Sequence, residues 1–131
     1  MQEILAIIRM NKINRTKEAL VDAGYPAFTA FRAAGRGSRP VDFEVLQAIN
    51  ANPTMGAEVL PTLSQGPRLI PKRMISMVVP DDKVGDVIQT IIKVNQTGNP
   101  GDGKIFTLPV TEVIRVRTGE TGPEAIDEMT G

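Results

Sequence analysis

The hydrophobic and polar positions of the chain predict five β-strands. Residues 4–8 and 74–79 are largely apolar on both alternating faces, which is the pattern of a strand covered on both sides. Residues 27–34 alternate more weakly and run into a glycine pair, and residues 105–108 and 112–117 form two short strands after a glycine-rich turn. The tail from Thr118 onward has the Gly, Pro and Thr content of a loop.

Two segments have the spacing of amphipathic helices. The clearer one carries apolar residues at i, i+3, i+4, i+7 and i+8, and Asp81 or Asp82 is expected to cap its positive end; these residues are Val84, Val87, Ile88, Ile91 and Ile92. The other begins at an expected Asn14 cap, continues through the sequence KEALVD and ends where Gly24 adopts a left-handed conformation. Each helix therefore stands between two predicted strands.

Regular signals disappear over residues 38–71, which contain five prolines. Connections in compact domains have a median of about 4–6 residues, so this stretch is either a working loop or a disordered insert. Within it, the sequence VDFEVLQAI (residues 41–49) has enough apolar residues for a short helix or a docking segment. The sequence leaves these alternatives open.

The order of elements is strand, helix, strand, long loop, strand, helix, strand, with one added C-terminal strand. This order predicts an α+β fold of the ferredoxin-like βαββαβ type, in a single domain over residues 1–131. Two helices cover only one face of such a sheet, yet residues 4–8 are apolar on both faces. A second subunit is therefore expected to cover the other face.

Composition removes several classes of function. The chain has 15 basic and 15 acidic residues, so it lacks the positive charge that draws proteins to nucleic acid or to membrane surfaces. It has no Cys and no His, which excludes disulfides, thiolate or imidazole metal sites, Cys nucleophiles and His bases. The apolar run near the N-terminus is five residues long, too short for a signal or a membrane span, so we expect a cytoplasmic protein.

One motif suggests an anion site. Gly98, Gly103 and Lys104 satisfy G-x-x-x-x-G-K, but Ile105 stands where a P-loop needs Ser or Thr, and a strand follows instead of a helix. The glycines either form an ordinary turn or expose backbone N–H groups as an anion-binding nest with Lys104 as the countercharge. Arg115 and Arg117 lie two apart on a predicted strand and so share a face. Solvent exposure explains such a pair by default, but with Lys104 and Lys72 it would also supply the charge for a polyphosphate.

Several stretches together resemble the PII nitrogen-regulatory signal-transduction proteins. The sequences QTGNPGDGKIF (96–106) and VIRVRTGETGPEAI (113–126) are similar to the family's B-loop, final strand and C-loop. The opening AIIR, the helix KEALVDAG, the pair PK at residues 71 and 72 and VVPDD at residues 78–82 also fit. The resemblance covers residues 1–37 and 70–126, and the long loop departs from it.

The resemblance implies a trimer that binds ATP or ADP in the clefts between its subunits. In this family the glycine loop and Lys104 hold the phosphates, the two arginines bind them from one side, and Thr29 and the backbone around Val78 receive the base. The implied nucleotide residues are Thr29, Gly35, Gly37, Val78, Gly101, Asp102, Gly103, Lys104, Arg115 and Arg117. The family also senses 2-oxoglutarate beside the phosphates, where Lys72 matches its lysine. Mg²⁺ would accompany the nucleotide, and no protein metal site is expected.

Two departures bear on regulation. Most members have a Gln-Lys pair after Gly37, whereas this chain has Ser38, Arg39 and Pro40, so a Gln ligand to Mg²⁺ is missing and Arg39 becomes a candidate for the oxo-acid carboxylate. The only tyrosine is Tyr25, which excludes modification of a tyrosine at the tip of the loop. Control is then expected to come from ligand binding or from some other modification.

The GRG…VDFE start, the extended loop and its ending GPRLIPKR look most like the second member of the PII pair encoded beside nitrogenase genes. That similarity implies direct inhibition of dinitrogenase, relieved by 2-oxoglutarate with ATP, by a homotrimer or by a hetero-oligomer with the sister protein. The alternatives are a PII-type regulator of an ammonium transporter or of glutamine synthetase, and a slow ATPase in which Asp102 or Glu120 orients water. No nucleic-acid partner and no membrane insertion are expected.

Overall fold

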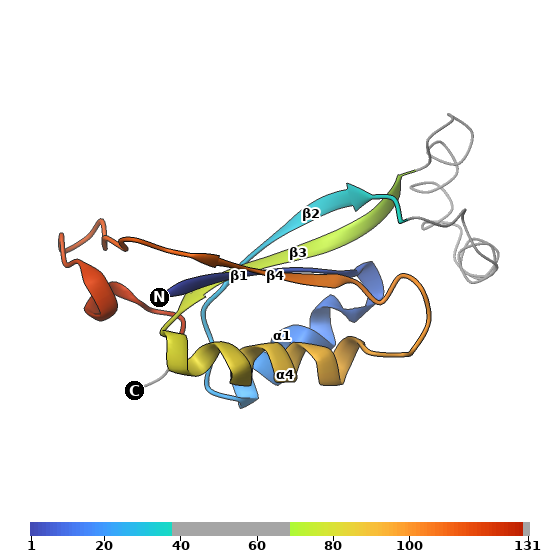
Figure 1. The fold of residues 1–131 in the computed structure, drawn as a ribbon, viewed down its shortest axis with the longest axis horizontal. Helices are drawn as coiled ribbons and strands as arrows, with labels where there is room; N and C mark the ends of the chain where they lie inside the picture. The colour runs from blue at the N-terminus through green and yellow to red at the C-terminus, as the bar shows by residue number, and fades with distance from the viewer. Residues whose placement is uncertain (38–68, 130–131) are drawn as a thin grey trace.

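The computed structural model describes residues 1–37 and 69–129, which form an antiparallel four-stranded sheet with two long helices on one side (Figure 1). The strand order is β2-β3-β1-β4. The strands are β1 (Gln2–Arg9), β2 (Thr29–Gly35), β3 (Ile70–Val79) and β4 (Lys104–Pro109), and the helices are α1 (Ile13–Asp22) and α4 (Val84–Asn95). Short 3₁₀ turns precede both helices and occur again at Gly122–Ala125. The predicted ferredoxin-like arrangement is confirmed.

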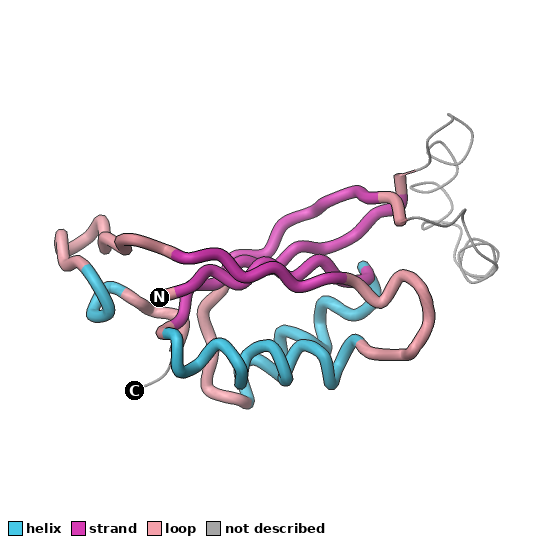
Figure 2. The backbone as a smooth tube through the Cα atoms, in the orientation of Figure 1, coloured by secondary structure: helices cyan, strands magenta, loops and turns pink. Residues whose placement is uncertain are grey.

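The hydrophobic core lies between the sheet and the helices (Figure 2). Alternate residues of β1, namely Ile4, Ala6 and Ile8, are buried against the helices. Leu20 of α1 and Ile91 of α4 meet them from the other side, also fully buried. Burying each such large aliphatic side chain stabilises the fold by about 1.5–3 kcal/mol. The apolar stripe predicted for α4 is therefore its core-facing side.

The opposite face of the sheet is apolar and open within the chain. Strand register aligns Leu5 with Ser76, Thr29 and Phe106, and the next row aligns Ile7 with Met74, Phe31 and Lys104. Phe31 is 42% exposed and Phe106 is 48% exposed, although both are large apolar side chains. Both described helices lie on the other side (Figure 2), so the expectation that they cover one face only is confirmed.

Both predicted helix caps at the N-terminal ends are wrong. Asn14 lies inside α1, because a 3₁₀ turn over Met10–Lys12 already begins the helical path. Neither Asp81 nor Asp82 caps α4, because both lie in the preceding 3₁₀ turn and the cap position is Lys83, without a side-chain hydrogen bond. The Asp81 carboxylate lies 3.0 Å from the N-terminal ammonium. The end of α1 is as predicted: Gly24 has φ of 95°, and the N–H of Tyr25 donates to the carbonyl of Leu20 at 2.8 Å.

Strand β3 begins earlier than residues 74–79 and takes in Ile70 and Pro71, which were assigned to the loop. Proline is tolerated here because the nitrogen of Pro71 faces the β1 side of the strand, and pairing with β1 ends at Lys72. Its missing N–H therefore costs no hydrogen bond between strands. Strand β2 begins at Thr29 instead of Ala27. The rest of the predicted loop, including residues 41–49, lies outside the described residues.

The predicted strand over residues 112–117 is wrong. This segment makes one isolated bridge, between Ile114 and Thr121, and no ladder with the sheet. The N–H of Arg115 donates to the carbonyl of Glu120 at 2.8 Å, and the N–H of Gly119 donates to the carbonyl of Arg115 at 2.7 Å. These local bonds fold the segment into a tight reversal at Gly119, whose φ is 74°.

Candidate functional site

The glycine loop, residues 97–103, connects α4 to β4 and is shaped by one of its own carboxylates. Asp102 accepts hydrogen bonds from the backbone N–H of Thr97 at 2.7 Å and of Gly98 at 2.9 Å, and from the Thr97 hydroxyl. Gly98, Gly101 and Gly103 all have positive φ angles, of 85°, 98° and 116°. The loop is therefore closed on itself by hydrogen bonds that need no ligand.

Arg9, the last residue of β1, ties this loop to the sheet. One guanidinium nitrogen lies 2.7 Å from the Asp102 carboxylate and another donates to the carbonyl of Pro100 at 3.1 Å. The two side chains are 18% and 23% exposed. Partial burial alone would raise the pKa of Asp102, but hydrogen bonds from Thr97, Gly98 and Arg9 together hold it well below its ordinary value. Asp102 therefore stays ionised, with its oxygens engaged in holding the loop.

Gly103 immediately precedes β4 and lies in direct contact with the backbone of β1. A Cβ at this position would lie 2.0 Å from the carbonyl oxygen of Ile7 and 3.3 Å from the Cα of Ile8. No side chain fits there, and the φ of 116° is itself one that L-residues rarely adopt. The spacing that resembled a P-loop thus includes a glycine required by packing.

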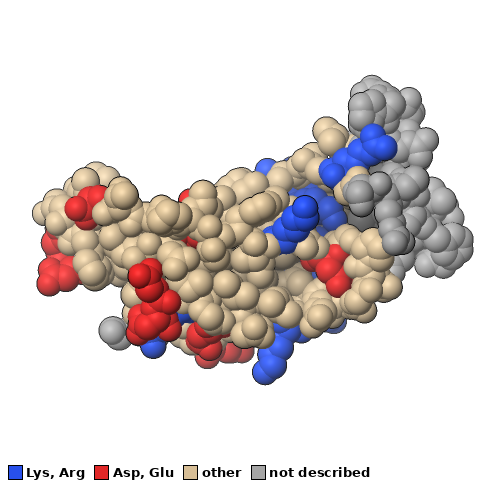
Figure 3. Space-filling view, in the orientation of Figure 1, with Lys and Arg blue, Asp and Glu red and all other residues tan. Residues whose placement is uncertain are grey.

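Several predicted site residues gather at this end of the sheet. The Lys72 ammonium donates to the carbonyl of Gly101 at 3.3 Å, and Lys72 is aligned with Arg9 across the strands. Gly35 closes β2 opposite Ile70, and Gly37 follows it. Most of the Lys and Arg atoms visible in Figure 3 lie toward this end, and most visible Asp and Glu atoms lie toward the other. Arg39 lies outside the described residues.

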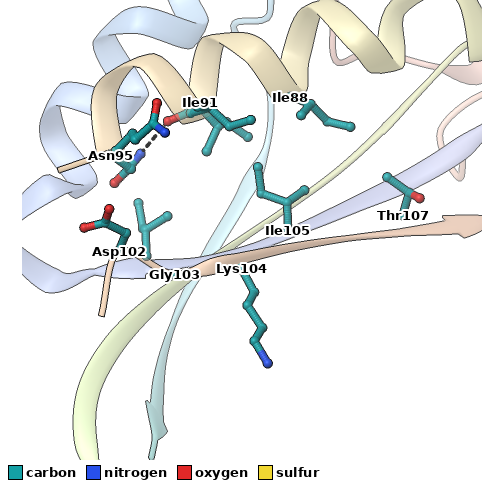
Figure 4. A pocket seen from close by; sticks show the side chains of 11 residues that line it. Ile88, Ile91, Asn95, Asp102, Gly103, Lys104, Ile105 and Thr107 are labelled. Atoms are coloured by element: carbon teal, nitrogen blue, oxygen red, sulfur yellow. Dashed lines mark hydrogen bonds between the residues drawn. The ribbon is translucent and has the colours of Figure 1, made fainter. Parts of the chain in front are cut away.

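The side chain of Lys104 points away from the helices, toward the open face (Figure 4). On the helix side of the same strand, an open groove of about 570 Å³ separates β4 from α4. Its walls are mainly aliphatic and include Ile88, Ile91 and Ile105. The groove and the Lys104 charge therefore belong to opposite faces, and the groove is unsuited to phosphate.

The other predicted residues lie at the far end of the sheet. Thr29 is aligned with Ser76, where pairing between β2 and β3 stops. The N–H of Val110 donates to the carbonyl of Met1, so the odd-numbered residues of β1 form their backbone hydrogen bonds with β4. The residues of β3 aligned with these odd-numbered residues therefore point their N–H and C=O groups away from β1. Val78, aligned with Glu3, consequently presents its N–H and C=O beyond the start of β2. A strand edge that pairs with no neighbouring strand can receive a purine base by hydrogen bonds.

One chain does not bring the two groups together. Lys72 and Val78 are six residues apart on β3, a separation of about 20 Å at the usual rise of an antiparallel strand. Gly101 contacts Lys72, while Thr29 lies close to the Val78 end. A single nucleotide site that uses both groups needs a second copy of the chain.

Arg115 and Arg117 follow β4 in the sequence and do not lie at the glycine-loop end of the sheet. The Arg115 guanidinium lies 2.6 Å from Glu120 and 2.6 Å from Asp127, and it donates to the carbonyl of Glu124 at 2.9 Å. Arg117 is exposed. Because the predicted strand is absent, alternation no longer places the two arginines on one face. Glu120 is paired with Arg115, and Asp102 is hydrogen-bonded within the glycine loop.

Sequence reasoning missed three participants. Arg9 was counted only as the end of an apolar run, although a cation at the end of a buried strand is a signal for a partner at that edge. Asp127 and Glu128 were placed in a tail with little regular structure, but Asp127 binds Arg115 and Glu128 lies beside the backbone N–H of Val78.

Within residues 1–37 and 69–129, which the structure describes, no helix is long and apolar enough to cross a membrane. In the same ranges, no three His, Cys, Asp or Glu side chains cluster closely enough to hold a metal ion.

Comparisons with known proteins agree with this geometry. The family described as "Nitrogen regulatory protein P-II" matches residues 1–120. A "Nitrogen fixation nifHD region GlnB-like protein 2" of Methanobacterium ivanovii is 48% identical over 127 residues, covering 96% of this chain and 99% of its own. A relative of Methanosarcina barkeri, "Nitrogen fixation nifHD1 region GlnB-like protein 2", is 45% identical over 127 residues, with the same coverage of each chain.

A solved structure extends the similarity to three dimensions. The PII protein of Arabidopsis thaliana, bound to citrate, superposes with a TM-score of 0.69 at 33% identity, covering 99% of this chain and 92% of its own. The glycine loop and the ferredoxin-like sheet both lie within these alignments. The chain therefore belongs to the nitrogen regulatory protein P-II family.

Proposed function

We propose that this protein is a binding regulator that senses adenine nucleotides and 2-oxoglutarate and controls nitrogenase by direct contact. The observation that carries the proposal is the prebuilt glycine loop, whose Gly101 carbonyl is contacted by Lys72 and whose strand carries Lys104 toward the open face. No chemical step is required of the protein.

The nucleotide site combines the two ends of the sheet from neighbouring copies. Lys104 and the loop backbone at Gly101 and Gly103 supply the phosphate side, with Gly35 and Gly37 nearby. Thr29 and the strand edge at Val78 supply the base side, and Arg115 and Arg117 add charge. Asp102 serves the site indirectly, by fixing the loop. Any Mg²⁺ would be held chiefly by the nucleotide's phosphate oxygens and water.

Assembly follows from the open sheet face. Phe31, Phe106 and Leu108 are 42%, 48% and 39% exposed on a face that the described helices do not cover. Burial of this face against neighbouring subunits gives the trimer typical of the family, either of identical chains or with the sister protein. The far ends of the sheets would then meet the glycine loops of adjacent subunits.

The effector site lies next to the glycine loop. 2-Oxoglutarate is a dicarboxylate, and Lys72 stands at the base of the long loop with its ammonium beside Gly101. The citrate named for the Arabidopsis relative is likewise a polycarboxylate, which supports a carboxylate effector in this family. Arg39 is a second candidate contact.

Nitrogenase is the target best supported by the context of the relatives, several of which carry the name of a nitrogen-fixation region. Recognition is assigned to the segment between Gly37 and Leu69, and action to the cytoplasm, where nucleotide and dinitrogenase occur together. Regulation of an ammonium transporter or of glutamine synthetase is the competing assignment.

Calorimetric titration with ATP tests the nucleotide site. Arg115→Ala and Arg117→Ala are each expected to weaken ATP binding by about 1.5–3 kcal/mol, the range for a hydrogen bond to a charged group. Arg15→Ala, on the exposed side of α1, is the matched control and should bind ATP normally. Unchanged affinity in both arginine variants would reject the assignment.

Acetylene reduction by dinitrogenase, with the regulator, its sister protein and ATP, tests the target. The intact protein should inhibit, and 2-oxoglutarate should relieve the inhibition. Deleting residues 41–65 should abolish inhibition and leave ATP binding intact, whereas Lys72→Ala should preserve inhibition and remove its relief. A deletion variant that still inhibits fully would transfer recognition to another surface.

A further inference from the structure

The C-terminal segment, residues 118–129, folds back onto the far end of the sheet. Its 3₁₀ turn spans Gly122–Ala125, where Ala125 is 5% exposed, and Met129 packs against the hydrophobic core. In Figure 1 this segment, coloured red, returns from beyond β4 toward the beginning of α4. The position of the segment is therefore set by burial of Ala125 in its 3₁₀ turn and by packing of Met129 against the core.

Asp127 of this segment holds Arg115. Its two carboxylate oxygens accept from two guanidinium nitrogens, at 2.6 Å and 3.3 Å. A carboxylate that accepts two N–H bonds from one arginine reproduces the way in which arginine binds a phosphate. Asp127 thus occupies the donors of Arg115 that a nucleotide phosphate would use.

The adjacent residue, Glu128, lies against the far strand edge. Its half-buried carboxylate lies beside the backbone N–H of Val78 and accepts from the N–H of Asp127 at 3.1 Å. The strand register leaves this N–H available, because Val78 turns it beyond the start of β2. Burial raises the pKa of Glu128, and the neighbouring backbone N–H groups offset only part of this rise.

We propose that Asp127 and Glu128 form a built-in competitor for nucleotide, occupying Arg115 and the Val78 edge until the nucleotide displaces them. The proposal rests on the proposed nucleotide site and adds a regulatory element to it. The Glu128 carboxylate stands in for the acceptor nitrogen of a base, and the Asp127 carboxylate for a phosphate. The apparent nucleotide affinity then equals the intrinsic affinity multiplied by the fraction of chains in which the segment is released.

The double variant Asp127→Asn, Glu128→Gln removes both charges and keeps Met129 in place. Its ATP affinity in calorimetric titration should be about fivefold higher than that of the unmodified protein, as expected if about one chain in five is released. Glu124→Gln is the matched control, since it makes the same change in the same segment but Arg115 contacts only the backbone carbonyl of Glu124. It should bind ATP with unchanged affinity.

Amide hydrogen exchange gives a second readout. Adding ATP to the unmodified protein should speed exchange at Ile126 and Asp127, whose N–H groups are bonded within the segment. Equal ATP affinity in the double variant and the unmodified protein, with no change in exchange, overturns the competitor and leaves the nucleotide site standing. Failure of every form to bind ATP overturns the nucleotide site and the competitor with it.

Discussion

The two ends of the sheet hold their polar groups in opposite ways. At the glycine-loop end, Asp102 and Arg9 are 23% and 18% exposed and join segments that are fixed by the strand ladder. At the far end, Arg115 is held by Glu120 and Asp127, which are 42% and 64% exposed. The first end is shaped before a ligand arrives, and the second is held by contacts that a ligand can replace. A ligand that binds at the first end does not have to break contacts within the chain. A ligand that binds at the second end must first displace the C-terminal segment, and this displacement lowers its net affinity.

Replacing Gly103 should break the rigid end most severely. Gly103→Ala forces a Cβ to within 2.0 Å of the Ile7 carbonyl at a φ of 116° and should lower the free energy of unfolding by about 3–5 kcal/mol. Gly98→Ala is the control, since its φ is 85° but nothing lies within 4 Å, and it should cost about 1–2 kcal/mol. Urea unfolding measures both. Equal losses would show that close packing on β1 is not what requires Gly103.

Asp102→Asn should weaken the same end by a smaller amount. The amide keeps one acceptor oxygen but loses the charge that attracts Arg9 and two backbone N–H groups, so we expect a loss of about 1–2 kcal/mol in urea unfolding. Asp81→Asn, an exposed site that contacts the N-terminal ammonium, should change little. The idea of a fixed loop fails if amide exchange at Thr97 and Gly98 is unaltered in Asp102→Asn.

Acid should affect this end through Asp102. The pKa of Asp102 is lowered in the folded state, so the stability it contributes is complete above the ordinary carboxylate pKa of about 4 and is lost as the pH falls below it. Unfolding midpoints between pH 2 and 5 should therefore fall more steeply for the unmodified protein than for Asp102→Asn. Parallel curves would contradict the assignment.

Salt should have the smallest effect and should act on the far end only. At 1 M salt the screening length is about 3 Å, so the exposed pairs of Arg115 with Glu120 and Asp127 should weaken and exchange at Ile126 should speed up. Exchange at Thr97 should stay constant. Faster exchange at both sites would mean that the two ends are held alike.

Much of the fold could be predicted because local patterns and burial agree. The stripe on α4 and the two-faced strands gave the layers and the open face, and Gly24 marked the end of α1. The helix starts were wrong because 3₁₀ turns precede them, and residues 112–117 were wrong because bonds between Arg115 and Glu120 close a turn that alternation cannot reveal. The buried bond from Asn95 to Thr16, 79 residues apart, likewise depends on how the two helices pack.

The candidate site could be predicted as a set of residue types but not as an arrangement. The glycines and cations were identified by motif and resemblance, and the structure places Lys72 against Gly101. The hydrogen bonds of Asp102 within its loop and the ion pair of Arg115 with Asp127 depend on which groups the folded chain brings close together. Charge counts and spacing contain no information on that competition.

The separation of about 20 Å between Lys72 and Val78 has a consequence for mixed populations of subunits. Each boundary between neighbours would combine the phosphate end of one chain with the base end of another. In the proposed trimer, a sister chain would make some boundaries hybrids, and each hybrid would take its anion specificity from one parent and its base specificity from the other. The ratio in which a cell synthesises the two chains would then set the proportions of these sensors.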